Sequence, residues 1–155
     1  MTAMLLQGPK TTRHLDELRG MLRGDVAPPG IATLVGLEFA SIELGRSIFE
    51  LSAGPQHANP MGTLHGGVLC DLADAAMGMA MASTLEDDES FTSLDLAVKF
   101  LKPVWKARLR ATAQIVKRSR TLGLLECDVT DEGGSLVARV YSTCMVLRGE
   151  DARGR

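Results

Sequence analysis

The spacing of apolar residues predicts a short helix and a β-hairpin in the first third of the chain. Residues 11–23 carry leucines at helical intervals, and the Pro-Pro-Gly run at 28–30 ends that helix. Residues 34–54 then contain two short apolar runs that meet at Leu44–Gly45. This pattern predicts two antiparallel strands joined by a tight turn.

A long apolar segment follows at residues 66–84. Its length and its alanine, methionine and leucine content predict a helix, which the chain enters from a turn-rich loop over residues 56–63. The segment is apolar on nearly every side, so we expect it to be buried. At about 20 residues it approaches the length of a membrane span, but its two aspartates and the β-rich pattern around it favour the core of a soluble protein.

The rest of the chain predicts four strands with short connections. Residues 91–103 alternate apolar and polar positions with a period of two, as do residues 106–118. Two more strands, 122–130 and 135–147, flank the Asp-Glu-Gly-Gly sequence at 131–134, a strong hairpin signal. Short connections make the sheet largely antiparallel, and we expect an α+β fold in which this sheet wraps the long helix.

Composition and charge are those of an ordinary globular protein. The 155 residues suffice for one domain with a proper core, and 45% are apolar and 23% charged. A net charge of -2 gives no electrostatic reason to expect nucleic acid or an anionic membrane as a partner.

The cysteines and the N-terminal sequence predict a cytoplasmic protein. Cys70, Cys127 and Cys144 lie far apart inside apolar patterns, which is typical of buried, reduced thiols. The first ten residues contain no cationic leader, and their apolar run is too short for a signal peptide. No CxxC or HExxH spacing occurs and the three histidines are scattered, so neither a metal nor a cofactor is expected.

The His65-Gly66-Gly67 sequence stands at the start of the long helix. A helix N-terminus offers unpaired N–H groups and the positive end of the dipole, and glycine lets a ligand oxygen approach the backbone. The sequence can therefore polarise a carbonyl or stabilise an oxyanion. A plain tight entry into the helix is the explanation that the two glycines taken alone favour, and the residues leave both interpretations open.

Asp71 and Asp74 are the two charges within the long helix, three residues apart on neighbouring parts of one face. An ionised carboxylate in an apolar helix is costly unless it is paired or reaches water. One interpretation is a face that reaches solvent or caps a strand. The other is a carboxylate that acts as nucleophile or general base in a cleft.

The distance along the helix limits how these groups can work together. Gly66 and Asp74 are eight residues apart, or about 12 Å at 1.5 Å per residue, which is too far for both to touch one reacting carbonyl. If both are catalytic, they come from two copies of the helix that lie antiparallel across a two-fold axis. Ala75, Ala76 and Gly78 are small enough to permit such an approach.

The runs NPMGTLHGGVLCDLAD at 59–74 and TSLDLAVKFLKP at 92–103 resemble the hotdog-fold acyl-CoA thioesterases of the PaaI-like and thioesterase superfamily member 2-like type. The resemblance implies a curved antiparallel sheet around a long central helix, with acyl-CoA as substrate. It also implies a homodimer with the active sites at its interface, usually paired further into a homotetramer. It divides the chain into an N-terminal extension with a short helix at 1–30, the hotdog thioesterase domain at 31–149 and a tail at 150–155.

Carried over by position, the resemblance assigns a role to each residue of the motif. Asp74 becomes the carboxylate that attacks the thioester or activates water, where related branches have a glutamate, and Gly66 donates its backbone N–H to the thioester oxygen. Asn59 positions the water or the thioester, and His65 lies near the thioester or the leaving thiolate. Ser93 lies near the catalytic carboxylate of its own protomer. Asp71 matches no catalytic position and is interpreted as structural.

The resemblance also implies basic residues that hold the phosphates of coenzyme A. The candidates are Lys102, Arg118, Ser119, Arg120 and Thr121, with Arg148 as a weaker one. The run KRSRT at 117–121 lies between two strands, where a charged, solvated turn is also the default expectation.

Two other functions remain open at this point. Hotdog dehydratases also use a loop histidine and a helix carboxylate, although the Asn-Pro-Met-Gly-Thr run points away from them. A non-catalytic acyl-CoA-binding module is the other, although such a module has no need of Asp74. The acyl group itself is not predicted: aromatic residues are 4% of the chain, and the methionines of the helix can line a tunnel or fill the core.

Overall fold

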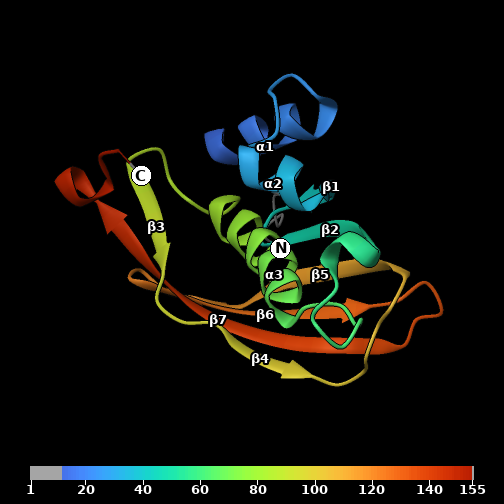
Figure 1. Ribbon diagram of the computed structural model, residues 1–155. Helices are drawn as coiled ribbons and strands as arrows, with labels where there is room; N and C mark the ends of the chain where they lie inside the picture. Colours follow the sequence, from blue (N-terminus) through green and yellow to red (C-terminus); the bar gives the residue numbers. More distant parts are fainter. Residues whose placement is uncertain (1–11, 155) are drawn as a thin grey trace, which may run out of the picture.

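A curved antiparallel sheet wraps the long helix α3 (Gly66–Ala82) in the computed structural model, which describes residues 12–154 (Figure 1). Within those residues seven strands form one sheet, in the order β1-β2-β5-β6-β7-β3, with β4 also paired to β7. The strands are β1 (Leu37–Glu43), β2 (Arg46–Ala53), β3 (Glu89–Ser93), β4 (Ala97–Phe100), β5 (Ala107–Arg118), β6 (Leu122–Thr130) and β7 (Leu136–Arg148). This confirms the expected α+β fold with a sheet around a central helix.

The core lies between α3 and the concave face of the sheet. Leu72, Ala76 and Met77 of α3 are almost completely buried there, against inward-facing side chains of β5 such as Leu109 and Ala111. The period-two pattern of β5 therefore predicted its buried face correctly. Strands β1 and β2 meet at the expected Leu44–Gly45 turn, and the loop at 131–134 joins β6 to β7.

One side of α3 is not covered by any other part of residues 12–154. Asp74 reaches solvent, and Ala75 and Gly78 are half-buried. The expectation that the whole helix is buried is thus wrong for this face. Ala76 points the other way and has no exposed surface, so it cannot contribute to a contact between two helices as the sequence suggested.

The predicted strand at 91–103 is two strands, so five strands rather than four follow α3 in the described chain. The break comes at Asp95, whose carboxylate accepts the Thr143 N–H at 2.7 Å and whose carbonyl accepts the Ser142 hydroxyl at 2.9 Å. The Asp95 side chain, rather than a backbone carbonyl of a neighbouring strand, thus accepts this N–H of β7. Leu94 and Phe100, expected on the buried face, are 55% and 58% exposed.

The N-terminal helices pack beside α3 and β1 rather than standing apart (Figure 1). Helix α1 (Arg13–Arg23) begins at Thr12, whose hydroxyl accepts the Leu15 N–H, and its buried leucines pack on Ile42 of β1. Helix α2 (Gly30–Val35) was not predicted, because six residues between Pro29 and Gly36 are too few to show a helical period.

Short 3₁₀ turns at Pro55–His57 and Gly149–Ala152 complete the elements. No helix in residues 12–154 has the length and apolar character needed to cross a membrane.

Candidate active site

His65 caps the N-terminus of α3 and leaves one backbone donor free. Its Nδ1 accepts the Gly67 N–H at 2.9 Å. The Gly66 N–H, at the first helical position, has no acceptor among the described residues. An unpaired N–H at the positive end of a helix dipole is suited to bind an oxygen that carries negative charge.

Asn59 holds the loop that leads to this helix. Its Oδ1 accepts the N–H groups of Met61 (2.9 Å) and Thr63 (3.1 Å), and its Nδ2 donates to the Thr63 hydroxyl at 2.8 Å. These bonds fix the loop without using the second N–H of the amide. The predicted contact of Asn59 with water or thioester therefore rests on that one remaining donor.

Asn59 and Gly66 line one cavity of about 370 Å³, together with Phe100 and Lys102. The Phe100 ring lies over Gly66 so closely that a Cβ there would approach it to 3.0 Å. Because the ring leaves no room for a side chain, this contact explains why residue 66 is a glycine, whether or not a ligand binds there.

Asp74 and Ser93 line a different cavity, of about 300 Å³, together with Cys70, Asp71 and Asp95. Both residues thus line the same cavity of one protomer, and the role of Ser93 beside a catalytic carboxylate stays a prediction. Cys70 and Asp71 were not among the predicted site residues. Their spacing of four and three residues from Asp74 on one helix is the signal that would have found them.

The two cavities separate the predicted site residues into two groups. Asn59, Gly66 and Lys102 surround one cavity, while Asp74 and Ser93 surround the other. Gly66 and Asp74 lie on the same unbroken helix, about 12 Å apart along its axis. Within one chain the Gly66 N–H and the Asp74 carboxylate therefore do not meet.

Two causes raise the pKa of Asp74 above its ordinary value. Partial burial is the larger, and the negative charge of Asp71 adds to it. The charge of Asp71 therefore disfavours the ionised form of Asp74, and the interpretation of Asp71 as a structural residue stays a prediction.

Burial raises the pKa of the Cys70 thiol, and the charges of Asp71 and Asp74 raise it further. These surroundings disfavour the thiolate, which is the nucleophilic form of cysteine. All three cysteines are free thiols, and Cys127 and Cys144 are buried as predicted.

The residues predicted to hold coenzyme A lie in two places. Lys102 lies beside Gly66, where it pairs with Asp131 at 2.5 Å. Arg118 and Arg120 line a third cavity, of about 330 Å³, with Arg148. Ser119 closes the turn between β5 and β6 through two hydrogen bonds with Leu122, and Thr121 is exposed in the same turn.

Glu89 anchors two of these three arginines. Its buried carboxylate pairs with Arg118 at 2.9 Å and with Arg148. Burial alone would raise the pKa of Glu89, but the Glu86 N–H and the two guanidinium groups together lower it. The side chain of Arg120 forms no ion pair within residues 12–154 and is exposed, so this arginine keeps its charge available.

The family model described as "Thioesterase superfamily" matches residues 61–138. Human acyl-coenzyme A thioesterase 13 is 31% identical over 131 residues, which cover 83% of this chain and 93% of that protein. The 1,4-dihydroxy-2-naphthoyl-CoA hydrolase of Listeria monocytogenes is 29% identical over 76% of this chain and 94% of its own length.

Solved structures agree with these matches. A phenylacetic acid degradation-related protein from Ralstonia eutropha JMP134 is 30% identical, with a TM-score of 0.75 over 82% of this chain and 97% of that one. The PaaI protein of E. coli, 20% identical, shares the fold with a TM-score of 0.78 over 90% of this chain and 98% of its own.

The fold is the hotdog fold, and the relatives identify the chain as a thioester hydrolase. The chain belongs to the thioesterase superfamily, and the expected likeness to PaaI-like thioesterases is confirmed.

We expect the pKa of Asp74 to lie above the ordinary aspartate value of about 4 and to fall in an Asp71→Asn variant. Removing the neighbouring charge removes a repulsion that disfavours the ionised form. Titration of the side-chain carboxyl carbons by NMR measures both values. Asp95→Asn is the control, because Asp95 lines the same cavity without raising the pKa of Asp74. An Asp74 pKa unchanged by Asp71→Asn would contradict the interaction.

Proposed function

We propose that the protein hydrolyses acyl-CoA thioesters to a free acid and coenzyme A, at sites shared between two copies of the chain. The observation that carries the proposal is the separation of the two functional groups. Gly66 offers a free N–H in one cavity, and Asp74 offers a carboxylate in another, on the same helix. An antiparallel pair of α3 helices brings the Gly66 of one copy to the Asp74 of the other, twice.

In this arrangement the Gly66 N–H and the helix dipole polarise the thioester carbonyl. Asp74 of the other copy then removes a proton from water as the water attacks the carbonyl carbon, or attacks that carbon itself. The C–S bond breaks and coenzyme A leaves as a thiolate. In the general-base route the thiolate takes up the proton that Asp74 removed from water. In the nucleophilic route water then hydrolyses the acyl–Asp74 anhydride, which releases the acid and restores the Asp74 carboxylate, and a proton of that water passes to the thiolate.

His65 and Ser93 take supporting roles in this mechanism. Because Nδ1 of His65 accepts the Gly67 N–H, the proton of the neutral ring is on Nε2. That N–H is free to donate to the thioester or to the leaving thiolate. Ser93, in the cavity of Asp74, is placed to hydrogen-bond the carboxylate or the attacking water.

Uncovered apolar surface supports association of two copies. Beside the uncovered Ala75–Gly78 face of α3, strands β3 and β4 form one edge of the sheet. Leu94, Phe100 and Leu101 are each more than half exposed along this edge. An open strand edge with exposed apolar side chains is suited to pair with another chain. A homodimer is thus the minimal active unit in this proposal, and further pairing into a homotetramer stays a prediction.

The arginines at the far end of α3 are the proposed site for the phosphates of coenzyme A. Arg118 contacts Thr84, just beyond the helix, at 3.4 Å, and Thr84 is ten residues, or about 15 Å, from Asp74. The extended pantetheine arm of coenzyme A can bridge this distance. The three guanidinium groups outnumber the two carboxylates of this cavity, Glu86 and Glu89, which leaves a net positive charge for an anion.

An Asp74→Asn variant should lose at least about a hundredfold in kcat, because the amide can neither accept the proton nor attack the carbonyl. Asp71→Asn, in the same cavity, is the matched control and should keep kcat within about tenfold. Released thiol from a panel of acyl-CoAs measures both, and size-exclusion chromatography checks that the assembly is unchanged. Near-normal turnover by Asp74→Asn, or crotonyl-CoA hydration in place of hydrolysis, would contradict the proposed reaction.

Arg120→Ala should raise KM for acyl-CoA by about tenfold with little change in kcat, since one charge-assisted phosphate contact is lost. The same acyl group carried on pantetheine, which lacks the nucleotide, should be hydrolysed equally by variant and wild type. Arg139→Ala is the control, because Arg139 pairs with Asp128 on the sheet, outside the arginine cavity. A KM that rises equally for acyl-CoA and acyl-pantetheine would exclude phosphate binding by Arg120.

A further inference from the structure

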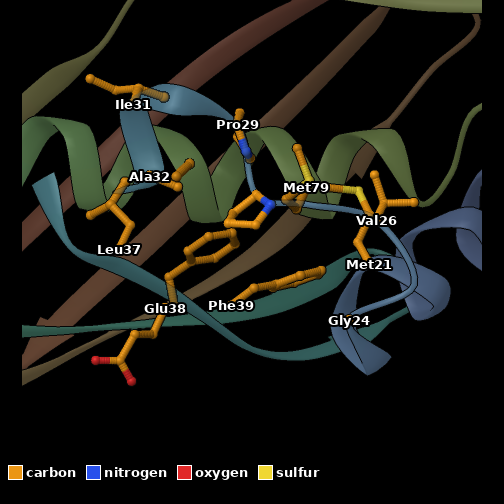
Figure 2. A pocket seen from close by; sticks show the side chains of 13 residues that line it. Met21, Gly24, Val26, Pro29, Ile31, Ala32, Leu37, Glu38, Phe39 and Met79 are labelled. Atoms are coloured by element: carbon orange, nitrogen blue, oxygen red, sulfur yellow. The ribbon is translucent and has the colours of Figure 1, made fainter. Parts of the chain in front are cut away.

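An apolar cavity of about 420 Å³ lies between the N-terminal helices, strands β1 and β2, and the uncovered side of α3 (Figure 2). Neither the catalytic mechanism nor the phosphate site uses it. Its walls include Met21, Val26, Ala32, Phe39, Phe49 and Met79.

The lining offers almost no polar partner to a ligand. Glu38 has the one ionisable side chain among the thirteen described lining residues. Its carboxylate is held by Arg108 at 2.6 and 2.7 Å, and Figure 2 shows it directed away from the cavity. A group with hydroxyl or charged substituents would lose its hydrogen bonds to water on entry without replacing them. The chemistry of the walls therefore selects a hydrocarbon.

The cavity begins next to the proposed catalytic carboxylate. Ala75, the residue after Asp74, and Met79 form its α3 wall. Each residue turns an α-helix by about 100°. Around the axis of α3, the residues that follow Asp74 toward the cavity are therefore Gly78, then Ala75, then Met79. A Cβ at Gly78 would meet Phe91 alone, at 3.6 Å. Only small residues of α3 thus separate the carboxylate from the cavity.

The volume indicates the size of the occupant. An engineered apolar cavity of about 150 Å³ holds benzene, with six carbons. By the same ratio a cavity of about 420 Å³ would hold roughly seventeen carbons if it were fully enclosed. Because part of this volume is open to solvent, the length of chain that it encloses is shorter, about ten carbons. Met21 and Met79 are flexible side chains that can adjust to a linear chain, and the rings of Phe39 and Phe49 stack on each other, 4.8 Å apart.

We propose that this cavity holds the acyl chain of the substrate, and that the enzyme prefers unsubstituted alkyl thioesters of about ten carbons. This inference rests on the proposed function, because the thioester must lie at Asp74 for its acyl chain to reach the cavity. The α1–α2 segment, by closing the cavity over β1 and α3, sets the length of chain that is accepted.

Hydrolysis of a series of saturated acyl-CoAs from two to sixteen carbons tests the proposal. In the wild type, kcat/KM should rise two- to fourfold per methylene, as expected for apolar burial, and stop rising near ten carbons. Val26→Trp should shorten the cavity, move the optimum to shorter chains and reduce kcat/KM for decanoyl-CoA by about tenfold or more. Met79→Ala should move the optimum to longer chains.

Leu34→Trp is the matched control for Val26→Trp. Leu34 lies on α2 of the same segment, is 82% exposed and does not line the cavity, so this variant should keep the wild-type profile. The proposal is overturned if Val26→Trp and Met79→Ala both keep that profile, or if the wild type prefers two- to four-carbon or aryl groups.

Calorimetric titration with decanoate separates this inference from the proposed function. Decanoate should bind wild type and Asp74→Asn, and bind Val26→Trp at least about tenfold more weakly. Decanoate binding that is sensitive to Val26→Trp, in a protein that hydrolyses no acyl-CoA, would contradict the proposed function and support the cavity as an alkyl site. Hydrolysis of acyl-CoAs without any decanoate binding or chain-length dependence would overturn the cavity assignment alone.

Discussion

The fixed rise of an α-helix is the constraint on which the rest of this structure depends. Helix α3 carries a free N–H at Gly66 and a carboxylate at Asp74, and about 12 Å of rigid helix keeps them apart. The sheet buries the opposite side of α3. Asp74 is exposed on the side that residues 12–154 leave uncovered, and Gly66 lies half-buried beneath the Phe100 ring at the start of the helix. In the proposed dimer, a second copy of the same helix supplies the missing group to each.

Burial and charge then give the two ends of the site different tasks. At the middle of α3, Asp71 and partial burial raise the pKa of Asp74, which makes it a stronger base than an ordinary aspartate. At the end of α3, buried Glu89 fixes Arg118 and Arg148 and leaves Arg120 free. The neighbouring apolar cavity contains neither a carboxylate nor a guanidinium group that faces a ligand. The three environments match the three parts of an acyl-CoA: thioester, phosphates and acyl chain.

Regular patterns predicted the parts of the structure that local physics determines. The period of β5, the hairpin turns and the start of α3 at Gly66 follow from side-chain alternation, glycine and capping. The break at Asp95 did not, because it depends on hydrogen bonds to Ser142 and Thr143, far away in the sequence. The spacing of Gly66 and Asp74 on one helix showed that they cannot share a site within one chain. The apolar cavity could not be predicted in this way, because its lining comes from five elements and follows no sequence pattern.

Mixing two inactive variants tests the shared site most directly. Gly66→Pro removes the N–H at the first helical position, where proline is tolerated. Gly66→Ala is its control, because alanine adds the same Cβ against Phe100 but keeps the N–H. Gly66→Pro and Asp74→Asn, each inactive alone, should recover about a quarter of wild-type activity after subunit exchange. Half of the dimers are then mixed, and each has one intact site of two. No recovery in verified mixed dimers would contradict the shared site.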